Sequence, residues 1–386
     1  MKKILIFNGY YHPSQNCGGP ITSIENIVNG CSDEFDFYIV CYNHDFNDMT
    51  PFDRNTNQWY TVGNAKVMYV KQGYLDFSSR NMRKLFDGLN PDLIWFSGVL
   101  TPNNKIVTVK IAKERNIPVL FSPRGEVSED RVKLKAYKKI PYLKLLNILR
   151  VYDGCYFHGT SDDEIDGIKK YFNPPLTHVF KIANISIFPQ NDIVEHSKHN
   201  GEVNLFFFSR IHEVKNLKFA IEAILQCRQK VNFDIYGPIE NEEYWNECQI
   251  LINSAPSNIK ISYKGIIDHN DLGHTIQKYD AFLFPTTNEN YGHVIAESLA
   301  NSRPVILSKG TTPWDDLDGK AGYVIDLDNR DSFTEVVDGM AGMNEELYAK
   351  LVQSTKAYFK KKIEKDGAVK GHKDMLYTIL KQVDKE

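Results

Sequence analysis

Short apolar segments rich in β-branched and aromatic residues recur along the whole chain, and each is followed by a stretch with helical periodicity. The segments are continuous rather than alternating, for example KILIF at 3–7 and AFLFP at 281–285. Strands of this kind are buried on both faces, as a parallel sheet covered by helices requires. The strand–helix rhythm therefore predicts an α/β protein with doubly wound, Rossmann-like sheets.

The expected strands fall into two groups, and helical periodicity dominates after about residue 340. The first group comprises 3–7, 35–40, 66–70, 92–96, 118–122, 154–159 and a last strand near 177–182. The second comprises 204–209, 232–237, 259–265, 281–285, 304–308 and 323–327. Because 386 residues are too many for one ordinary core, we expect two domains, 1–185 and 186–365, with a hinge near 183–200.

Charge and cysteine usage exclude several classes of protein. The net charge of −3 argues against a nucleic-acid binder, which is usually basic. The six cysteines are scattered, with no Cys-x-x-Cys pair and no Cys/His cluster, so we expect reduced thiols in a cytoplasmic protein. The apolar run Ile4–Phe7 is too short for a signal peptide, and no run of 18 apolar residues could span a membrane.

The segment NENYGHVIAESLAN at 288–301 carries two glutamates that we expect on different elements. Glu289 lies in the loop after a buried strand, whereas Glu297 lies about one turn inside a helix that begins near Gly292. Helical side chains lean toward the N-terminus, so Glu297 could reach a group held above the start of the helix. A carboxylate there could accept hydrogen bonds from the two vicinal hydroxyls of a ribose.

The start of that helix is a candidate phosphate site. The amides of Gly292, His293 and Val294 would point outward at the positive end of the helix dipole. Glu289, in the preceding loop, would suit a sugar hydroxyl better than proton transfer. The same pattern also fits a solvated Glu297 and a Glu289 that only favours the helix start by its charge.

Two cations follow the first strand of the second half, in SRIHEVKN at 209–216. Arg210 and Lys215 would lie at the carboxyl end of that strand, where open α/β sheets bind ligands. A guanidinium fork and an ammonium point charge together suit a diphosphate. Taken alone, the pair could equally be solvated surface cations.

The first half offers weaker candidates. Gly18 and Gly19 open a helix after the first strand, where a backbone could approach a ligand closely, although a plain turn explains them equally well. Arg124, in SPRG at 122–125, could bind an anion or a polar acceptor, or be a structural arginine at the sheet edge. His158 ends a strand, where a packed histidine is more common than a base. No G-x-G-x-x-G fingerprint supports nicotinamide or flavin binding.

Acidic residues of the first half favour helix capping over metal binding. Ser161 and Glu164 have the spacing of a capping box, which accounts for the run Asp162–Glu164. No Asp-x-Asp loop is present to hold a divalent ion beside a diphosphate. We therefore expect no metal and no other cofactor.

The segment RVKLKAYKKIPYLKLLNILR at 131–150 carries seven cations and no acidic residue, with apolar residues between them. This combination is typical of a basic amphipathic surface on anionic lipid. A solvated basic helix that packs by its apolar stripe is the alternative. Pro141 would kink or divide the helix.

The features together resemble the family 4 glycosyltransferases, which have two Rossmann-like domains separated by a cleft, the GT-B fold. The resemblance spans nearly the whole chain, and its most specific part is the E-x7-E stretch followed by RPVI. The residues that carry it are GG at 18–19, SPRG at 122–125, SRIHEVKN at 209–216, ENYGHVIAESLANSRPVI at 289–306 and TTPWDDL at 311–317.

The resemblance implies a UDP- or GDP-sugar donor held mainly by the C-terminal domain, and a reaction that retains anomeric configuration without a metal. Arg210 and Lys215 would neutralise the diphosphate, which helps to deprotonate the acceptor. Glu297 would take the ribose hydroxyls. The remaining donor contacts would come from the following residues: Gly18, Gly19, Gly265, Ile266, Glu289, Asn290, Gly292, His293 and Val294. The last helix, about 366–386, would return to the N-terminal domain.

The N-terminal domain would bind the acceptor, and here the sequence departs from the family. Many relatives carry a histidine near the acceptor where this chain reads SPRGE, so attention moves to Arg124. The SPRG and TPW segments resemble those of enzymes that build bacterial capsule or O-antigen. With the basic segment 131–150, a lipid-linked saccharide acceptor at the inner face of the membrane is expected. A non-catalytic nucleotide-sugar binding protein and a nucleotide-sugar epimerase of the same fold are the alternatives.

Overall fold

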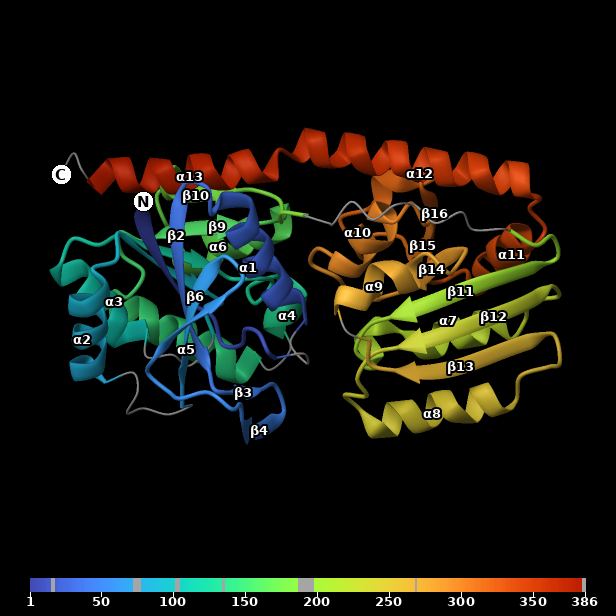
Figure 1. Ribbon diagram of the computed structural model, residues 1–386, viewed down its shortest axis with the longest axis horizontal. Helices are drawn as coiled ribbons and strands as arrows, with labels where there is room; N and C mark the ends of the chain where they lie inside the picture. The colour runs from blue at the N-terminus through green and yellow to red at the C-terminus, as the bar shows by residue number, and fades with distance from the viewer. Residues whose placement is uncertain are drawn as a thin grey trace. The chain divides into compact units, whose positions relative to one another are not determined.

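The chain divides into two compact units, each built on its own sheet (Figure 1). In this computed structural model the described residues are 1–14, 18–71, 78–100, 105–133, 136–186, 198–267 and 269–383. The first unit comprises Met1–Ile187 and Asp366–Glu386, and the second comprises Phe188–Lys365. Most of the segment expected to be the hinge, 183–200, lies outside the described residues.

The first unit contains a sheet of eight strands in the order β10-β9-β8-β7-β1-β2-β6-β5. All neighbouring pairs are parallel except β5 with β6. The strands are β1 (Lys2–Phe7), β2 (Phe35–Tyr42), β5 (Trp59–Val62), β6 (Ala65–Val70), β7 (Leu93–Ser97), β8 (Val119–Ser122), β9 (Tyr156–Gly159) and β10 (Val179–Lys181). The seven strands expected here are confirmed to within about two residues, which is the usual uncertainty at an element's ends.

The antiparallel edge strand β5 was not expected. Its residues WYTV are half-buried or exposed, because an edge strand has a neighbour on one side only and helices do not cover both its faces. The expectation of continuous apolar runs applies to strands buried on both faces. It also misses the short hairpin of β3 (His44–Asp45) and β4 (Asp48–Pro51), whose second strand is fully exposed.

Two apolar layers cover the faces of this sheet. Alternate residues of β1 point to opposite sides, so Leu5 and Phe7 belong to one cluster and Ile4 and Ile6 to the other. The Leu5 face is covered by α2 (Ser79–Leu89), α3 (Lys105–Glu114), α5 (Ala136–Ile148) and α6 (Asp162–Phe172). The Ile4 face is covered by α1 (Gly18–Cys31) and α13 (Ala368–Val383). Helix α13, from the end of the chain, thus packs on the sheet of the first unit.

The basic segment 131–150 forms α4 (Glu129–Lys133) and α5, and two residues outside the described ranges, 134–135, separate them. Pro141 lies inside α5 and does not divide it, contrary to one of the two expected outcomes. Among the described residues, no helix is both long enough and apolar enough to cross a membrane.

The second unit contains a fully parallel sheet in the order β13-β12-β11-β14-β15-β16. Its strands are β11 (Glu202–Phe208), β12 (Lys230–Tyr236), β13 (Ile259–Gly265), β14 (Ala281–Phe284), β15 (Val305–Ser308) and β16 (Gly322–Ile325). All six expected strands are confirmed. In chain order this is the 3-2-1-4-5-6 arrangement of doubly wound dinucleotide folds.

Helices follow the strands of the second unit and bury a single apolar cluster against the sheet. They are α7 (Leu217–Ile224), α8 (Glu242–Asn253), α9 (His269–Ile276), α10 (His293–Ala300), α11 (Arg330–Ala341) and α12 (Glu345–Asp366). The residues of the cluster run from Val203 to Tyr348, so this core needs no residue of the first unit.

Candidate donor site in the second unit

The central strands β11 and β14 mark the point where the strand order reverses. From β11 the chain proceeds outward through β12 and β13, and from β14 it proceeds outward the other way through β15 and β16. Loops that leave the carboxyl ends of two such strands diverge, and ligands of open α/β sheets bind there. The two loops concerned are 209–216 and 285–292, which contain the cations and the first glutamate singled out from the sequence.

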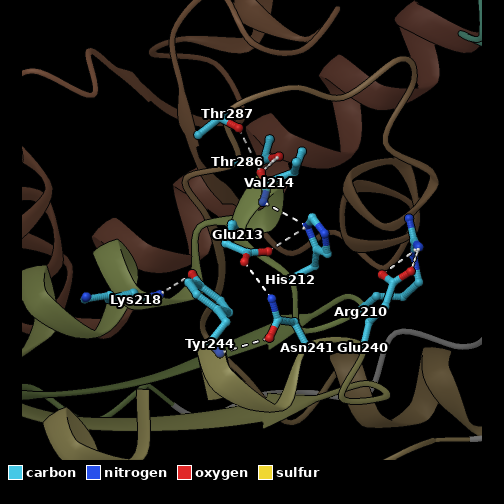
Figure 2. Close-up of polar contacts among 10 residues, drawn as sticks. All are labelled: Arg210, His212, Glu213, Val214, Lys218, Glu240, Asn241, Tyr244, Thr286 and Thr287. Carbon is cyan, nitrogen blue, oxygen red and sulfur yellow. Dashed lines mark hydrogen bonds and ion pairs between the residues drawn. The ribbon is translucent and has the colours of Figure 1, made fainter. Parts of the chain in front are cut away.

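Hydrogen bonds join these two loops directly. The Thr286 hydroxyl and the Thr287 amide both donate to the carbonyl oxygen of Val214, each at 2.9 Å, as Figure 2 shows for the side chain. The Asn216 side chain donates to the carbonyl oxygen of Pro285 at 2.9 Å. Three bonds between segments about 70 residues apart in the chain hold the loop of Lys215 against the loop of Glu289.

Lys215 and Glu289 form an ion pair at the junction. The Lys215 ammonium lies 2.5 Å from Glu289 Oε2, and the two side chains are 9% and 20% exposed. The ammonium also lies 5.6 Å from the centroid of the Phe284 ring at the end of β14. Little water reaches this pair, so it interacts more strongly than a surface pair would. A negatively charged ligand bound at this point would replace Glu289 as the partner of Lys215.

Arg210 lies at the end of β11 and is held by a carboxylate that the sequence did not single out. Its Nη1 donates to both carboxylate oxygens of Glu240, at 2.8 and 2.7 Å (Figure 2). Glu240 belongs to the loop after β12, the strand next to β11. A guanidinium has five N–H donors, and both of these bonds use Nη1, so the other nitrogens can bind an anion while Glu240 fixes the side chain.

Other side chains around the same turn shape the backbone (Figure 2). His212 caps the short 3-10 turn Glu213–Lys215, because its Nδ1 accepts the Val214 amide at 3.3 Å. Glu213 accepts from the Asn241 side chain at 2.6 Å, and Asn241 also caps α8. The arrangement links the loops after β11 and β12 and sets the direction in which Lys215 leaves the turn.

Helix α10 begins where the sequence predicts. Gly292 is its N-cap with φ +78°, and the first amide bonded within the helix is that of Ile295, which donates to the Gly292 carbonyl oxygen at 2.9 Å. The amides of Gly292, His293 and Val294 therefore precede the first helical bond, as a phosphate site requires. Glu297 lies one turn inside, as expected.

Gly292 could not be replaced without strain. A Cβ built there would lie 2.6 Å from Cδ1 of Ile295 and 3.2 Å from Cγ of Glu289, and its φ is one that other residues rarely adopt. The glycine thus lets the loop of Glu289 pass close to the first turn of α10.

Glu297 differs from the solvated residue that was the alternative interpretation. Its side chain belongs to a residue only 6% exposed, and burial raises the pKa of its carboxyl to about 8. The cause is desolvation, which disfavours the charged form. Burial therefore favours the neutral acid near pH 7, and a neutral carboxyl can donate one hydrogen bond and accept others.

The TTPWDDL segment at 311–317 holds the loop before α10 in place by two hydrogen bonds. The indole nitrogen of Trp314 donates to the Tyr291 carbonyl oxygen at 2.5 Å, and the Glu289 amide donates to the Thr311 carbonyl oxygen at 2.8 Å. Trp314 is 1% exposed. This part of the motif has a positioning role, since it fixes the backbone of residues 289–291.

Gly265 and Ile266 lie at the end of β13, beside the loop after β12. The Gly237 amide donates to the Gly265 carbonyl oxygen at 2.9 Å, and Ile266 is 55% exposed. Gly237 itself has φ +131°, and a Cβ there would lie 1.9 Å from the Ser209 carbonyl oxygen. Only glycine allows the backbone after β12 to pass this close to the backbone after β11. This close passage places the loop of Glu240 next to Arg210. Asn290 lies between Glu289 and Gly292, and it is half-buried.

In the first unit, Gly18 and Gly19 begin α1, and among the described residues no atom lies within 4 Å of a Cβ built on Gly19.

Arg124 lies in the loop after β8 with φ +54°, and its Nη1 donates a hydrogen bond to the side-chain oxygen of Asn184 at 2.9 Å. Its Nε and Nη2 are buried and have no hydrogen-bond partner among the described residues. Burial lowers the pKa of this guanidinium to about 10.

His158 is a packed histidine and not a candidate base. Its Nδ1 lies 2.9 Å from the Ser122 hydroxyl and its Nε2 lies 3.0 Å from the Ile182 carbonyl oxygen. Burial lowers the pKa of His158 well below 6.5, and His372 and Arg124 lower it further. Nearby, Ser161 caps α6 as predicted, but the Glu164 carboxylate accepts from the Gly125 and Thr160 amides and so completes no capping box with Ser161.

Glu240 and Gly237 were not expected in this site, and no role was assigned from the sequence to Tyr291 or Trp314, although both lie in the motifs at 289–306 and 311–317. One signal was available for the first two. YGPIEN at 236–241 directly follows a predicted strand, and in the doubly wound order that strand adjoins the strand of Arg210.

Residues 189–358 match the model of the family "Glycosyl transferases group 1". The matched part contains every element of the candidate donor site and is less than half of the chain. Solved structures extend the comparison to the first unit. Sucrose-phosphate synthase from Thermosynechococcus elongatus has a TM-score of 0.72 at 10% identity, with 99% of this chain and 100% of that chain covered. The chain has the GT-B fold.

Two further GT-B structures are similar over most of their length. HepE from Anabaena, solved with UDP and glucose, has a TM-score of 0.68 at 15% identity and covers 100% and 99% of the two chains. WaaG, a glycosyltransferase involved in lipopolysaccharide biosynthesis, has a TM-score of 0.66 at 12% identity and covers 92% and 95%. At such identities the likeness concerns the GT-B fold.

Among proteins similar in sequence are two streptococcal subunits named UDP-N-acetylglucosamine–peptide N-acetylglucosaminyltransferase GtfA. The subunit of Streptococcus pneumoniae serotype 4 is 22% identical over 176 residues, and that of Streptococcus agalactiae is 24% identical over 146 residues. The alignments cover 44% and 37% of this chain. The chain spans only 34% and 27% of the lengths of these two relatives.

Proposed function

We propose that this protein is a glycosyltransferase that moves a sugar from a UDP-sugar to a saccharide or lipid-linked saccharide. One observation carries the proposal. Arg210 and Lys215 both lie in the loop that leaves β11 at the switch point of the second sheet, and Lys215 contacts Glu289 in the loop that leads into α10, within the part of the chain that matches group 1 glycosyltransferases. Two cations and a helix start at one place suit a diphosphate.

The two cations would stabilise the leaving diphosphate. Glu240 and Glu289 balance their charges, and these ion pairs would keep both side chains in place for the donor. When the donor binds, Lys215 would turn from Glu289 to the phosphate, and Glu289 would be released to bind a hydroxyl of the donor sugar. Charge that develops on the diphosphate as the glycosidic bond breaks would be stabilised by groups already in position.

Retention and metal independence are parts of the same proposal. The departing phosphate would take the proton of the acceptor hydroxyl on the face where the sugar leaves, so the new bond forms on that face. Side-chain cations and backbone amides would supply the positive charge. We expect transfer in the presence of excess EDTA, and loss of transfer with EDTA that returns with Mg²⁺ or Mn²⁺ would contradict this part.

The nucleotide contacts would come from Glu297 and from the end of β13. Because its pKa is about 8, Glu297 would both donate to one ribose hydroxyl and accept from the other, instead of only accepting as the sequence suggested. Gly265 and Ile266 would border the base. UDP is favoured over GDP because the similar HepE was solved with UDP and the GtfA subunits are named for a UDP-sugar.

A ligand-induced rise in melting temperature would test the donor site. UDP and UDP-sugars should stabilise the wild-type protein by mass action, and GDP should do so less. Lys215→Met should weaken UDP binding by roughly 10–100-fold, the loss expected for a charge-assisted contact to phosphate. The matched control is Lys218→Met, which removes a lysine three residues away that pairs with Glu247 at 2.6 Å. Equal effects of the two variants, or no shift with any nucleotide, would contradict the proposal.

The products distinguish the alternatives. Incubation with a labelled UDP-sugar and a membrane lipid extract should yield labelled lipid or saccharide. A changed sugar nucleotide in the absence of acceptor would indicate an epimerase, and tight UDP-sugar binding with neither product would indicate a binding protein.

We also propose that α5 lies on an anionic membrane surface, as a lipid-linked acceptor in capsule or O-antigen synthesis would require. Leu143 and Leu146 are buried, whereas Tyr137, Leu145 and Ile148 are 73%, 50% and 77% exposed on the same helix. The exposed lysines Lys138 and Lys144 are the chain neighbours of Tyr137 and Leu145. Large apolar side chains bordered by cations are typical of interfacial helices.

Sedimentation with vesicles tests this part independently of UDP binding. We expect binding to vesicles that contain phosphatidylglycerol and little binding to pure phosphatidylcholine. Ile148→Gln should reduce the bound fraction several-fold, while Ile250→Gln, which changes an isoleucine 70% exposed on α8, should not. Equal sedimentation of both variants would contradict the membrane role of α5.

A further inference from the structure

A cavity of about 360 Å³ lies in the first unit against residues of β1, β2, β6 and β5, whereas Arg124 follows β8. Its wall includes two lysines, Lys3 and Lys66, three aromatic residues, and the last residues of α2. Lys3 and Lys66 are near the amino ends of their strands, β1 and β6. Ligands of doubly wound folds bind at the carboxyl ends. The cavity is therefore distinct from the proposed acceptor region.

The unexpected edge strand β5 creates this cavity. Tyr38 of β2, Lys66 of β6 and Thr61 of β5 are register partners in a row across three strands. Helix α2 ends at Leu89, where the Lys3 ammonium donates to the Leu89 carbonyl oxygen at 2.9 Å. The row of side chains and the last two residues of this helix, Gly88 and Leu89, line the same cavity.

The aromatic rings of Tyr38 and Trp59 pack edge to face in the wall of the cavity. The rings of Tyr38 and Trp59 have centroids 5.2 Å apart at 81°, and both residues are half-buried. Trp59 is exceptional in this chain, because Trp95, Trp245 and Trp314 are at most 6% exposed. Half-buried aromatic rings that line a concave site are typical of ligand contacts.

The charge of the cavity is positive. Among its lining residues are two ammonium groups and no carboxylate, and the Lys66 ammonium lies 5.5 Å from the centroid of the Tyr38 ring. The backbone around Leu89, however, presents the carbonyl oxygens of a helix C-terminus, which carries partial negative charge. This end favours ligand hydroxyl donors and disfavours a chain of phosphates.

We propose that this cavity binds a segment of an acidic saccharide. The apolar faces of sugar rings would pack on Trp59 and Tyr38, hydroxyls would donate to the carbonyl oxygens at the end of α2, and a carboxylate would pair with Lys66. The binding goes beyond the proposed transfer reaction, since it needs no nucleotide. In a transferase it would hold part of a polymeric acceptor away from the reacting end.

Isothermal titration calorimetry of the full chain tests the proposal with a hyaluronan decasaccharide, which has one carboxylate per disaccharide, and with neutral maltodecaose. We expect saturable binding of the acidic chain and binding of the neutral one weaker by about tenfold or more. Trp59→Ala should abolish binding, and Trp59→Phe, which keeps a ring, should restore it in part. Lys66→Gln should remove the preference for the acidic chain, whereas Lys260→Gln, an exposed lysine on edge strand β13, should not.

Four results would overturn the proposal. They are no binding up to about 10 mM, equal affinity for both saccharides, unchanged affinity in a folded Trp59→Ala protein, and displacement of the saccharide by UDP. The last result would place the saccharide at the donor site, so it would refute the cavity while leaving the proposed transferase function standing. Conversely, saccharide binding without any UDP binding would support the saccharide site in the cavity and would contradict the proposed donor site.

Discussion

At the residue scale, Glu297 is the most unusual group of the candidate site. It is buried in α10 and its pKa is raised to about 8 from an ordinary 4.5 by loss of solvation. A group whose folded pKa is raised in this way binds a proton in the folded protein between about pH 4.5 and 8 that it lacks when unfolded. Its contribution therefore lowers stability as the pH rises through this window.

The first prediction follows from that sign. Glu297→Gln keeps the shape of the side chain and removes the charge, so it should raise the free energy of unfolding at pH 8.5 by about 3–5 kcal/mol and change it by less than about 1 kcal/mol at pH 5. Urea unfolding of the ligand-free protein at the two pH values measures this difference. An equal effect at both values would show that the carboxyl is ionised in the fold.

A second prediction separates backbone strain from side-chain crowding at two glycines with nearly the same φ. Gly292 and Gly265 have φ of +78° and +79°, but a Cβ meets atoms within 4 Å only at Gly292. Gly265→Ala should cost about 1 kcal/mol for the conformation alone, and Gly292→Ala should cost about 1–3 kcal/mol more because Ile295 must move. Equal losses in the free energy of unfolding, measured with urea, would mean that Ile295 and the first turn of α10 move aside at little cost.

The positions of Lys215, Glu289 and Gly292 on loops that follow two neighbouring strands were predictable from the sequence. Sequence reasoning succeeded here because carboxyl ends of parallel strands share one edge of a sheet, so order along the chain nearly gives position in space. It missed Glu240, since the bond to Arg210 depends on the rotamers of two side chains 30 residues apart. It also treated Glu297 as a carboxylate, because burial of a helix face is a property of tertiary packing.

At the element scale, α13 is as much a part of the first unit's core as the strands are. Met375, Leu376 and Ile379 are at most 1% exposed and pack on the Ile4 face of the sheet. Lys373 also forms ion pairs with Asp33 and Glu34 at 2.6 and 2.7 Å, just after α1. Continuous apolar strands and long helices were predictable from periodicity, but β5 was not, because an edge strand need not be apolar on both faces.

Ile379→Ala tests this role of α13. Removal of a fully buried side chain should lower the free energy of unfolding of the first unit by about 2–4 kcal/mol. Lys381→Ala, an exposed position on the same helix, should change it by less than about 0.5 kcal/mol. Hydrogen exchange of α1 and β1 would report the loss within that unit, and exchange confined to the end of α13 would contradict a shared core.

At the scale of the whole molecule, the two units have separate cores. The apolar cluster of the second unit is complete within Val203–Tyr348 and its partly buried neighbours, while the first unit draws on both ends of the chain. The division into two α/β units was predictable from the two groups of strands.

A fragment of residues 188–365 should accordingly fold alone and bind UDP within about tenfold of the full chain, since all the donor-site residues except Gly18 and Gly19 lie in it. A fragment of residues 1–187 should not fold cooperatively, because α13 is missing from one face of its sheet. Circular dichroism melts of both fragments check this. A cooperative melt of the N-terminal fragment would show that α13 is dispensable.

The return of α13 has a consequence for how the protein is made. The N-terminal sheet emerges from the ribosome with one face only partly covered, and its missing helix is translated roughly 180 residues, or ~10–40 s, later. During that interval the nascent chain exposes Ile4, Ile6 and their neighbours, a ready target for holdase chaperones. The half that is synthesised second can thus be the first to reach its native state.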